Sequence, residues 1–418
     1  MRDGGRIAAA IEVLDDIETR HRPARLALKA WGEAARYAGA KDRAFVSGLV
    51  LDVLRHRRSL AFAMGDETNR ARVFGGLRTH WEWPTERIKA ASEEEHGPGS
   101  LTAHEEVRLA VPAELAPAPV RGDFPDWLEA SLARVFADSA AEAAALSARA
   151  PVDLRVNTLK TDVAHVMKAL EAFHPEPVGA LPNALRIPAP AASERAAPVE
   201  ATPAFEKGWF EVQDLGSQIA AAAAGDIKGQ QVLDFCAGGG GKTLALAAAM
   251  GNTGQLYAYD ADARRLKETV VRAQRAGVRN LQVRSPTEKD PLRGLDGKMD
   301  LVFVDSPCTG SGTWRRHPDA KWRLTPRQLE QRMAEQDAVL DAAAPFVKPG
   351  GRLIYVTCSL FAEENEDRVG AFLNRAEGFA VTPAAGADAH LTPQGFLRLT
   401  PLSAGTDGFF VAVLTKAH

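Results

Sequence analysis

The fold of this chain is decided by one stretch near its middle, Gln231-Val232-Leu233-Asp234-Phe235-Cys236-Ala237-Gly238-Gly239-Gly240-Gly241-Lys242-Thr243. An apolar run ends here in a cluster of four glycines, and a helix-like segment follows. The pattern predicts a buried strand, a sharp turn and a helix, because glycine allows turns and close backbone approach that other residues resist. The helix N-terminus would offer unpaired N–H groups and a positive dipole end to a nucleotide-like ligand. A plain structural turn is the alternative, although such a turn needs only one or two glycines.

Strand-like and helix-like segments alternate on both sides of this turn. The expected strands are 231–235, 255–259, 281–283, 300–304 and 352–357. The expected helices are 215–224, 242–250, 261–276, 326–346 and 362–373. This rhythm predicts an α/β fold with a doubly wound, mostly parallel, Rossmann-like sheet. Ligands of such sheets bind beyond the carboxyl ends of the strands, so the residues that follow each strand are the candidates for chemistry.

The chain has room for further domains before this sheet. Apolar residues recur at helical spacing through residues 1–148, around Ile7 to Leu14, Phe45 to Leu54 and Trp127 to Phe136, which predicts a helical bundle. Strand-like alternation at Val152 to Val156 and again at 184–187, around a helix-like 163–170, predicts a small α+β module. Residues 188–207 are rich in Ala and Pro and are expected to form an extended linker. We therefore expect domains at 1–148, 149–205 and 206–418.

Composition narrows the class of protein. The chain has 418 residues, a hydrophobic content of 45% and a net charge of -3, which excludes a disordered chain and a generally basic nucleic-acid coat. No uncharged apolar run reaches the roughly 18 residues of a membrane span, and the N-terminus lacks a signal-peptide pattern. The three cysteines are far apart and lack the close pairs of a zinc site. We expect a cytoplasmic protein with no membrane partner and no metal.

A second acidic residue refines the expected ligand. Asp260 follows the second strand, 19 positions after Gly241, where an acid accepts hydrogen bonds from ribose hydroxyls in dinucleotide-binding folds. An adenosine cofactor without a phosphate chain fits both loops, and S-adenosyl-L-methionine is such a molecule. Alternatively, Gly241-Lys242-Thr243 half-matches a phosphate-binding loop, and Asp260 is a helix-capping or surface residue.

Two thiols follow two strands that should be neighbours. The fourth strand leads into Asp305-Ser306-Pro307-Cys308, and the fifth leads into Thr357-Cys358-Ser359. A lone cysteine is more often a buried core residue, but two at matching strand ends favour chemistry. A thiolate near a helix N-terminus or a cation is a strong nucleophile that can add to an electron-poor ring carbon.

A basic segment with two tryptophans comes next. From Arg315 to Arg332 six basic residues stand against Asp319 and Glu330, so the stretch has a local charge of +4. Arginines interleaved with Trp314 and Trp322 suit phosphate contacts and base stacking. A solvated basic face with two core aromatics is the alternative interpretation.

Together these motifs resemble the RsmB/Fmu (Sun) family of bacterial 16S rRNA cytosine-C5 methyltransferases. The resemblance lies in the Asp305-x-Pro-Cys308 loop with its Lys321-Trp322-Arg323 tail and in Cys358 followed by Glu363-Glu364-Asn365-Glu366. It extends to Arg155-Val156-Asn157, to Gln213-Asp214, and to the NusB-like pattern Lys41-Asp42-Arg43-Ala44-Phe45-Val46. Two departures stand out: Gly238 and Gly239 replace the Ala-Pro usual in the family's Cys-Ala-Ala-Pro-Gly-Gly-Lys loop, and Ser285 lies where an acid commonly follows the third strand.

The resemblance implies a class I methyltransferase sheet after a NusB-like RNA-binding helical domain. It implies that Cys358 is the nucleophile, that Cys308 assists product release and that Asp305 contacts the base. It also implies that S-adenosyl-L-methionine binds at Asp305, Asp260 and the loop Cys236-Ala237-Gly238-Gly239-Gly240-Gly241-Lys242. The expected partner is a flexible or single-stranded RNA, rRNA by resemblance, acted on by a monomer. A P-loop NTPase and an RNA-binding or ribosome-assembly factor that has lost the reaction are the competing hypotheses.

Overall fold

The glycine cluster joins a strand to a helix in the computed structural model of this protein, which describes residues 1–111, 116–192, 194, 197–384 and 388–418. Strand β5 (Gln231–Asp234) ends before the turn, and helix α14 (Gly241–Met250) begins at its last glycine. Gly238 and Gly240 have φ angles of 55° and 86°, in the left-handed region that glycine adopts without strain. The turn has the strand, glycine and helix order that the sequence predicts.

The chain divides into two compact units. The helical unit consists of Met1–Ala150, Ala189–Ala196 and Trp314–Leu324, and the sheet unit consists of Pro151–Pro188, Ala197–Thr313 and Thr325–His418. The expected boundaries at 148, 205 and 206 remain a prediction, since the two units are interleaved along the sequence.

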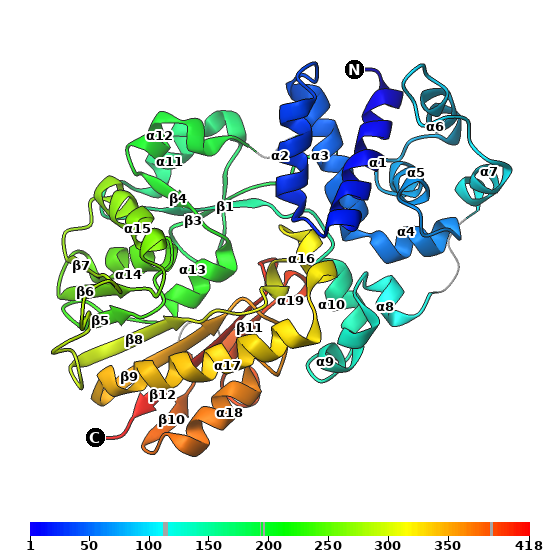
Figure 1. The fold of residues 1–418 in the computed structure, drawn as a ribbon. Helices are drawn as coiled ribbons and strands as arrows, with labels where there is room; N and C mark the ends of the chain where they lie inside the picture. Colours follow the sequence, from blue (N-terminus) through cyan, green and yellow to red (C-terminus); the bar gives the residue numbers. More distant parts are fainter. Residues whose placement is uncertain (112–115, 193, 195–196, 385–387) are drawn as a thin grey trace. The chain divides into compact units, whose positions relative to one another are not determined.

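Helices build the helical unit (Figure 1). They are α1 (Asp3–Arg20), α2 (Ala24–Ala34), α3 (Ala40–Arg55), α4 (Arg57–Met64), α5 (Asn69–Thr79), α6 (Thr85–Ser92), α7 (Ala103–Ala110), α8 (Ala118–Arg121), η1 (Asp126–Leu128), α9 (Glu129–Ala133), α10 (Ser139–Ala145) and α16 (Pro318–Arg323). The helix expected through Phe136 is wrong at its end, because α9 stops at Ala133.

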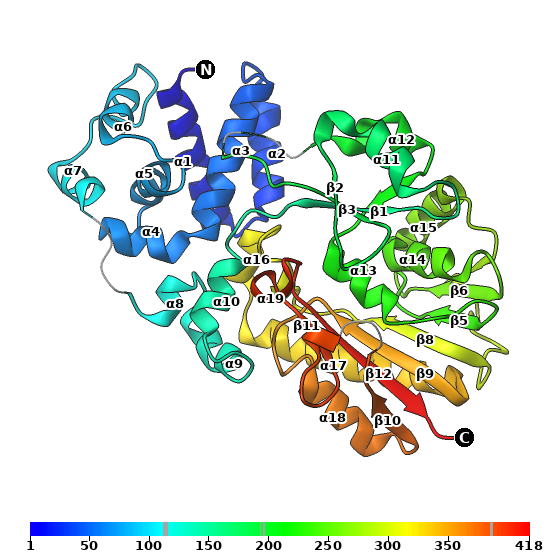
Figure 2. The same cartoon turned by 180° about the vertical axis from the view of Figure 1, so that it is seen from behind.

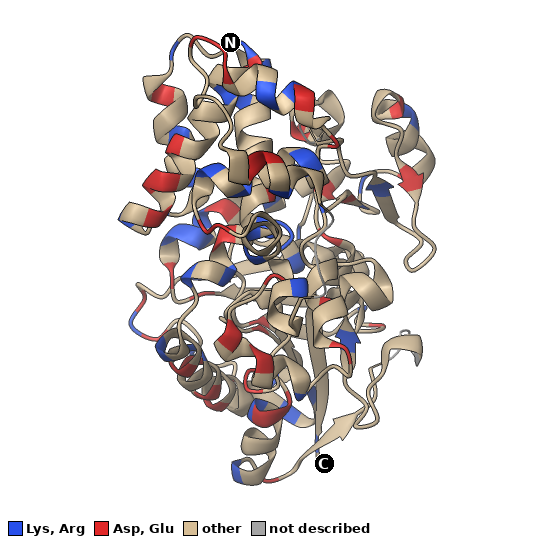
Figure 3. Ribbon diagram, turned by 90° about the vertical axis from the view of Figure 1, so that its right-hand side faces the viewer, with Lys and Arg blue, Asp and Glu red and all other residues tan. Residues whose placement is uncertain are grey.

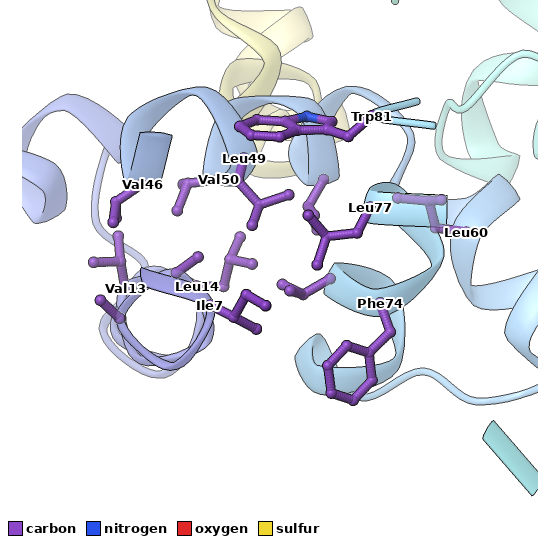
Figure 4. Packing of buried hydrophobic residues seen from close by; sticks show 14 of the residues in the cluster. Ile7, Val13, Leu14, Val46, Leu49, Val50, Leu60, Phe74, Leu77 and Trp81 are labelled. Carbon is purple, nitrogen blue, oxygen red and sulfur yellow. The ribbon is translucent and has the colours of Figure 1, made fainter. Parts of the chain in front are cut away.

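The core of the helical unit lies between α1, α3 and α5. Ile7 and Leu14 of α1, Leu49 of α3 and Phe74 of α5 are each at most 1% exposed, and Figure 4 shows these side chains converging. The helical spacing around Ile7 and Phe45 in the sequence therefore marks a buried face, as expected of an amphipathic bundle.

Two sheets build the sheet unit. The smaller, antiparallel sheet has the order β2-β3-β1-β4 and consists of β1 (Val152–Val156), β2 (Glu176–Pro177), β3 (Ala184–Ile187) and β4 (Phe210–Val212). Around it lie α11 (Val163–Ala169), η2 (Glu171–Phe173), η3 (Val199–Ala201) and α12 (Pro203–Glu206). The linker expected at 188–207 is wrong where η3 and α12 form, and its residues 193, 195 and 196 lie outside the described residues.

The larger sheet of the described residues has eight strands in the order β10-β12-β9-β8-β5-β6-β7, with β11 paired to β12. Its strands are β5, β6 (Gln255–Tyr259), β7 (Leu281–Arg284), β8 (Met299–Asp305), β9 (Val347–Thr357), β10 (Phe379–Thr382), β11 (Leu397–Leu399) and β12 (Phe409–Lys416). The block from β7 to β9 is parallel, as predicted, whereas β10, β11 and β12 pair antiparallel and the sequence reading did not identify them.

Helices cover both faces of this sheet (Figures 1 and 2). One face carries α13 (Leu215–Ala222), α14 and α15 (Ala263–Ala276), and the other carries α17 (Pro326–Ala343) and α18 (Glu366–Arg375). Alternate residues of β8 serve the two faces: Phe303 packs into the core beneath α13 and α14, whereas Val304 packs into the core beneath α17 and α18. The α/β class with a parallel-rich sheet is confirmed. The helix expected from Ala362 is wrong at its start, because α18 begins at Glu366.

Short 3-10 turns complete the sheet unit: η4 (Ser311–Thr313), η5 (Ala344–Phe346) and η6 (Asp388–His390), followed by α19 (Pro401–Ala404).

Candidate functional site

Neighbouring parallel strands bring the candidate residues to one edge of the large sheet. Strands β6, β5, β8 and β9 lie side by side and run parallel, so their carboxyl ends meet. Asp260 follows β6, Asp234 ends β5, Asp305 ends β8, and Cys358 follows β9.

The two thiols are in contact. Cys308 Sγ and Cys358 Sγ are 3.4 Å apart, and both cysteines are free and half-buried. Their loops are also joined through the backbone, because Gly312 N–H donates to the carbonyl of Cys358 at 2.9 Å. The structure thus brings together two residues that are 50 positions apart in the sequence.

The surroundings of Cys308 favour its neutral form. The hydrogen bond with Cys358, burial and the nearby Glu364 carboxylate raise the pKa of the Cys308 thiol well above its usual value. A neutral Cys308 can donate its S–H to a thiolate on Cys358. The pair can therefore hold one negative charge on one sulfur.

A cation and a carboxylate lie beside the thiols. Lys242 Nζ donates to Asp305 Oδ2 at 2.9 Å. Burial opposes the charge of Lys242, but Asp305, Cys358 and Asp234 outweigh it, and the pKa of Lys242 is raised. Lys242 is therefore a permanent positive charge at neutral pH, close to Cys358. Phe409 presents its ring 5.1 Å from the ammonium.

Asp260 braces the glycine turn. Its Oδ2 accepts a hydrogen bond from the N–H of Gly238 at 2.8 Å, and its Oδ1 accepts one from the N–H of Asp262 at 2.8 Å. Each carboxylate oxygen has a second lone pair, so a ribose hydroxyl could still bind there. Asp260 is 6% exposed, which limits that contact to its outer edge.

The rest of the glycine loop is fixed from behind. Thr269 Oγ1 donates to the carbonyl of Gly238 at 2.9 Å, and Arg272 donates to the carbonyl of Gly239 at 2.6 Å. Ala237 is 8% exposed, and Cys236 packs against the core on the α17 face. Burial raises the pKa of the Cys236 thiol well above its usual value. Cys236 is therefore a packing residue, apart from the reactive pair.

The turn fits an adenosine-type cofactor. A Cβ added at Gly241 would meet no atom closer than 3.9 Å, which leaves the start of α14 open, and the first N–H groups of a helix have no partner within it. After the third strand, the hydroxyl of Ser285 lies 2.8 Å from the hydroxyl of Thr287, so this position offers a hydroxyl in place of a carboxylate.

Asp234 and Glu364 also lie at this edge, and neither is among the site residues predicted from the sequence. Asp234 is fully buried; its Oδ2 accepts a hydrogen bond from Thr243, and its Oδ1 has no partner among the described residues. Burial raises the pKa of Asp234 to about 7. Glu364, fully buried, accepts hydrogen bonds from residues of both cysteine loops. Thr309 and Ser359 directly follow the two cysteines, and these two polar residues are the sequence signal for a buried partner such as Glu364.

The first part of the basic segment, Trp314–Leu324, belongs to the helical unit. Trp314 and Lys321 are each 1% exposed, and Arg315 is 4% exposed. Lys321 Nζ donates to the carbonyl of Arg55 at 2.8 Å and to Ser147 Oγ at 3.2 Å. Of the two interpretations of this segment, contact with RNA is therefore wrong for these three buried side chains, whereas Arg323 and Arg327 are exposed and their contact with RNA stays a prediction. Figure 3 shows basic and acidic residues interspersed on the helices of this unit.

Within the part of the chain that the structure describes, no group of three or more His, Cys, Asp or Glu side chains is placed to hold a metal ion. None of the helices that the structure describes is long and apolar enough to cross a bilayer.

Several known proteins are similar to this chain in sequence and in fold. A family model described as 16S rRNA methyltransferase RsmB/F matches residues 225–415, and a model of the RsmF/B ferredoxin-like domain matches 124–194. The ribosomal RNA small subunit methyltransferase B of Citrobacter koseri is 33% identical over 76% of this chain and 72% of its own. A probable protein of the same name from Synechocystis is 34% identical over 70% and 67%. The crystal structure of PH0851 has a TM-score of 0.75 at 26% identity and covers 100% of this chain and 99% of its own.

Proposed function

Because this chain belongs to the RsmB/F family of S-adenosylmethionine-dependent methyltransferases, we propose that it methylates carbon 5 of a cytosine in RNA, with 16S rRNA as the substrate. The observation that carries the proposal is the 3.4 Å contact between Cys308 and Cys358 beside the Lys242–Asp305 ion pair. A P-loop NTPase leaves these two thiols without a role, and the family assignment removes the reason to prefer it.

Carbon 5 of cytosine is a weak nucleophile. Covalent catalysis makes it more nucleophilic by adding a thiolate to the neighbouring carbon 6 first, which divides one difficult step into two easier ones. Cys358 Sγ, as a thiolate, forms a bond to carbon 6, and the electron pair of the 5,6 double bond moves toward carbon 5. S-adenosyl-L-methionine, held by the glycine loop and Asp260, would supply an electrophilic methyl group to carbon 5 and would keep, as an uncharged thioether, the electrons of the bond that breaks.

Release of the product restores the ring. The proton on carbon 5 leaves to water, the 5,6 double bond reforms, and the bond between carbon 6 and Cys358 Sγ breaks with its electrons on sulfur. Cys308, held neutral 3.4 Å away, keeps its proton and donates a hydrogen bond that stabilises the departing thiolate. Cys358 thus leaves the ring as the thiolate with which the reaction began.

Lys242 and Asp305 act on the pyrimidine edge. Asp305 would accept a hydrogen bond from the exocyclic amino group, and the Lys242 ammonium would stabilise the negative charge that develops on the ring after addition. The 2.9 Å ion pair keeps both groups in one orientation. The target base must leave its stack to reach this edge, so a flexible or single-stranded segment is the expected substrate.

The test is transfer of a labelled methyl group to fragments of 16S rRNA. Cys358→Ala should abolish transfer, and Cys308→Ala should accumulate a protein–RNA adduct that survives denaturant. Glu377→Gln, at an exposed position outside the site, is the control and should keep transfer. Full activity of Cys358→Ala would contradict the mechanism. RNA binding by the wild type without methyl transfer would favour an assembly factor that has lost the reaction.

A further inference from the structure

A buried carboxylate lies behind the two cysteine loops. Glu364 is 0% exposed and lies between β9 and α18. It accepts hydrogen bonds from Thr309 N–H at 2.8 Å, from Thr309 Oγ1 at 2.5 Å, from Gln336 Nε2 at 2.9 Å and from Ser359 Oγ. Burying a carboxylate is costly unless donors satisfy it, and here donors meet both of its oxygens.

The donors to Glu364 have special positions in the sequence. Thr309 directly follows Cys308, and Ser359 directly follows Cys358. Gln336 of α17 also donates to the carbonyl of Pro307, which precedes Cys308, at 2.9 Å. One side chain therefore connects the two loops whose sulfurs must meet.

From this arrangement we propose that Glu364 is a positioning residue that holds the two cysteine loops together and assigns the nucleophile's role to Cys358. The inference rests on the proposed function for its chemical meaning. The hydrogen-bond partners of Glu364 among the described residues include neither sulfur, so it acts through Thr309 and Ser359 and through its charge.

The neighbouring residue reinforces the geometry. Asn365 Nδ2 donates to the carbonyl of Ser359 at 2.9 Å, and Asn365 Oδ1 accepts from Thr357 Oγ1 at 2.6 Å. Residues on both sides of Cys358 are thus fixed by the same pair, Glu364 and Asn365. Two adjacent polar residues set the position of the Cys358 loop, and the first of them also sets the Cys308 loop.

The charges around the thiols are asymmetric. Cys308 faces Glu364, whose carboxylate contributes to its raised pKa, and Tyr355 lies near both. Cys358 faces Lys242, which is paired with Asp305, and Asp234 lies beyond them. Arg368 of α18 is near Tyr355 but is bonded to Asp337. Burial raises the pKa of Glu364 itself, and once Glu364 is ionised a negative group lies beside Cys308 while the Lys242 ammonium lies near Cys358, so the two thiols have opposite electrostatic surroundings.

The experiment measures the two thiols separately in the full chain. Each cysteine is alkylated with iodoacetamide over a range of pH, and mass spectrometry of the peptides gives the rate at each. In the wild type the alkylation midpoint of Cys308 should lie above that of an ordinary thiol. In Glu364→Gln the midpoint of Cys308 should fall by roughly one pH unit, because a neighbouring negative charge has been removed. The kcat for methyl transfer should fall about 10- to 100-fold with KM for RNA nearly unchanged.

Two further variants separate charge from geometry. Ser359→Ala removes one hydrogen-bond donor to Glu364 but keeps the carboxylate. The alkylation midpoint of Cys308 should therefore stay raised while kcat falls. Glu335→Gln, on α17 beside Gln336, removes an equal charge from a surface ion pair with Arg332 and should change neither thiol. If Glu364→Gln does not fold, the kcat values of Ser359→Ala and Thr309→Val test whether Glu364 positions the two cysteine loops. Unchanged kcat in both variants would contradict that positioning role.

The outcomes distinguish this inference from the proposed function. An unchanged Cys308 midpoint in folded Glu364→Gln would overturn the inference, even if the wild type methylates RNA. The opposite result is also informative. If the Cys308 midpoint shifts in Glu364→Gln but the wild type transfers no methyl group to any RNA, the proposed function is wrong and the role of Glu364 beside the thiols stands.

Discussion

Asp234 is a titrating group sealed inside the protein. It is fully buried, and burial raises its pKa to about 7, with Asp305 and Asp260 adding to the effect against the hydrogen bond from Thr243. The folded protein therefore holds a proton on Asp234 between about pH 4 and pH 7, where the unfolded chain has released it. This group's contribution to stability is complete below the unfolded pKa and is lost as pH rises through 7.

Asp234→Asn should flatten that pH dependence. The neutral amide can still accept the hydrogen bond of Thr243, and it does not ionise, so between pH 4 and pH 8 the variant should gain up to ~4 kcal/mol relative to the wild type. Denaturant unfolding at several pH values measures this difference. Asp290→Asn, at an exposed position, is the control. Parallel curves for Asp234→Asn and the wild type would show that Asp234 is ionised in the folded state.

The sequence could locate some site residues and not others, for a physical reason. Cys308, Cys358 and Asp305 follow apolar strands, and the parallel-sheet rule places strand ends at one edge. Glu364 belongs to the motif that follows Cys358, but its role could not be assigned from the sequence, because it depends on Thr309, 55 positions away, and Gln336, 28 positions away. The motif marks the residue and does not reveal these distant partners. The burial of Lys321 was hidden in the same way, since its partner Arg55 is 266 positions distant.

At the scale of elements, Asn157 joins the small sheet to the large one. Its Nδ2 donates at 2.8 Å both to the carbonyl of Gly208 and to the carbonyl of Ala276 at the end of α15. Asn157→Ala would leave two carbonyls without this partner, and we expect a loss of about 2–3 kcal/mol in the free energy of unfolding. Asn183→Ala is the matched control, because its amide makes one bond of 3.4 Å to the carbonyl of Val156. Equal losses of stability in the two variants would argue against a role for Asn157 in joining the two sheets.

The segment around α16 stabilises the helical unit. Trp314 is among its largest fully buried side chains, and Trp322 Nε1 donates to the carbonyl of Leu54 at 2.6 Å. Trp314→Ala should lower stability by about 3–5 kcal/mol, as truncation of a buried aromatic does elsewhere. The salt dependence of RNA binding should stay unchanged, whereas loss of a phosphate contact would reduce its slope. Denaturant unfolding and RNA titrations at several salt concentrations measure both.

Elements with local signals were easier to predict than those without. Strand β5 and helix α14 are specified by neighbouring residues, an apolar run and a glycine turn. The central position of β12, between β9 and β10, depends on pairing across some 50 residues of chain, with Val411 opposite Val356. Such pairing has no signature within the strand itself, which explains why the antiparallel side of the sheet was missed.

At the scale of the whole molecule, two cores predict two unfolding steps. Ile7 and its neighbours form one cluster, and the clusters on the two faces of the sheet form another unit. Calorimetry should resolve more than one transition. S-adenosylmethionine at about 100 times its Kd should stabilise only the sheet unit, by ~2.7 kcal/mol. A single transition that shifts as one on cofactor addition would show that the units unfold together.

The inserted segment Trp314–Leu324 has a consequence for how the nascent chain folds. The helical unit is otherwise finished, apart from Ala189–Ala196, at Ala150, yet Lys321 and Trp322 come 171 and 172 residues later. At roughly 5–20 residues per second, ribosomes need about 9–34 s to add that stretch. Until then the carbonyl of Leu54 lacks its bond from Trp322, and the carbonyl of Arg55 has Ser147 as a donor but not Lys321. A fragment cut at Ala150 would lack both later donors permanently and should be less stable than the helical unit of the full chain.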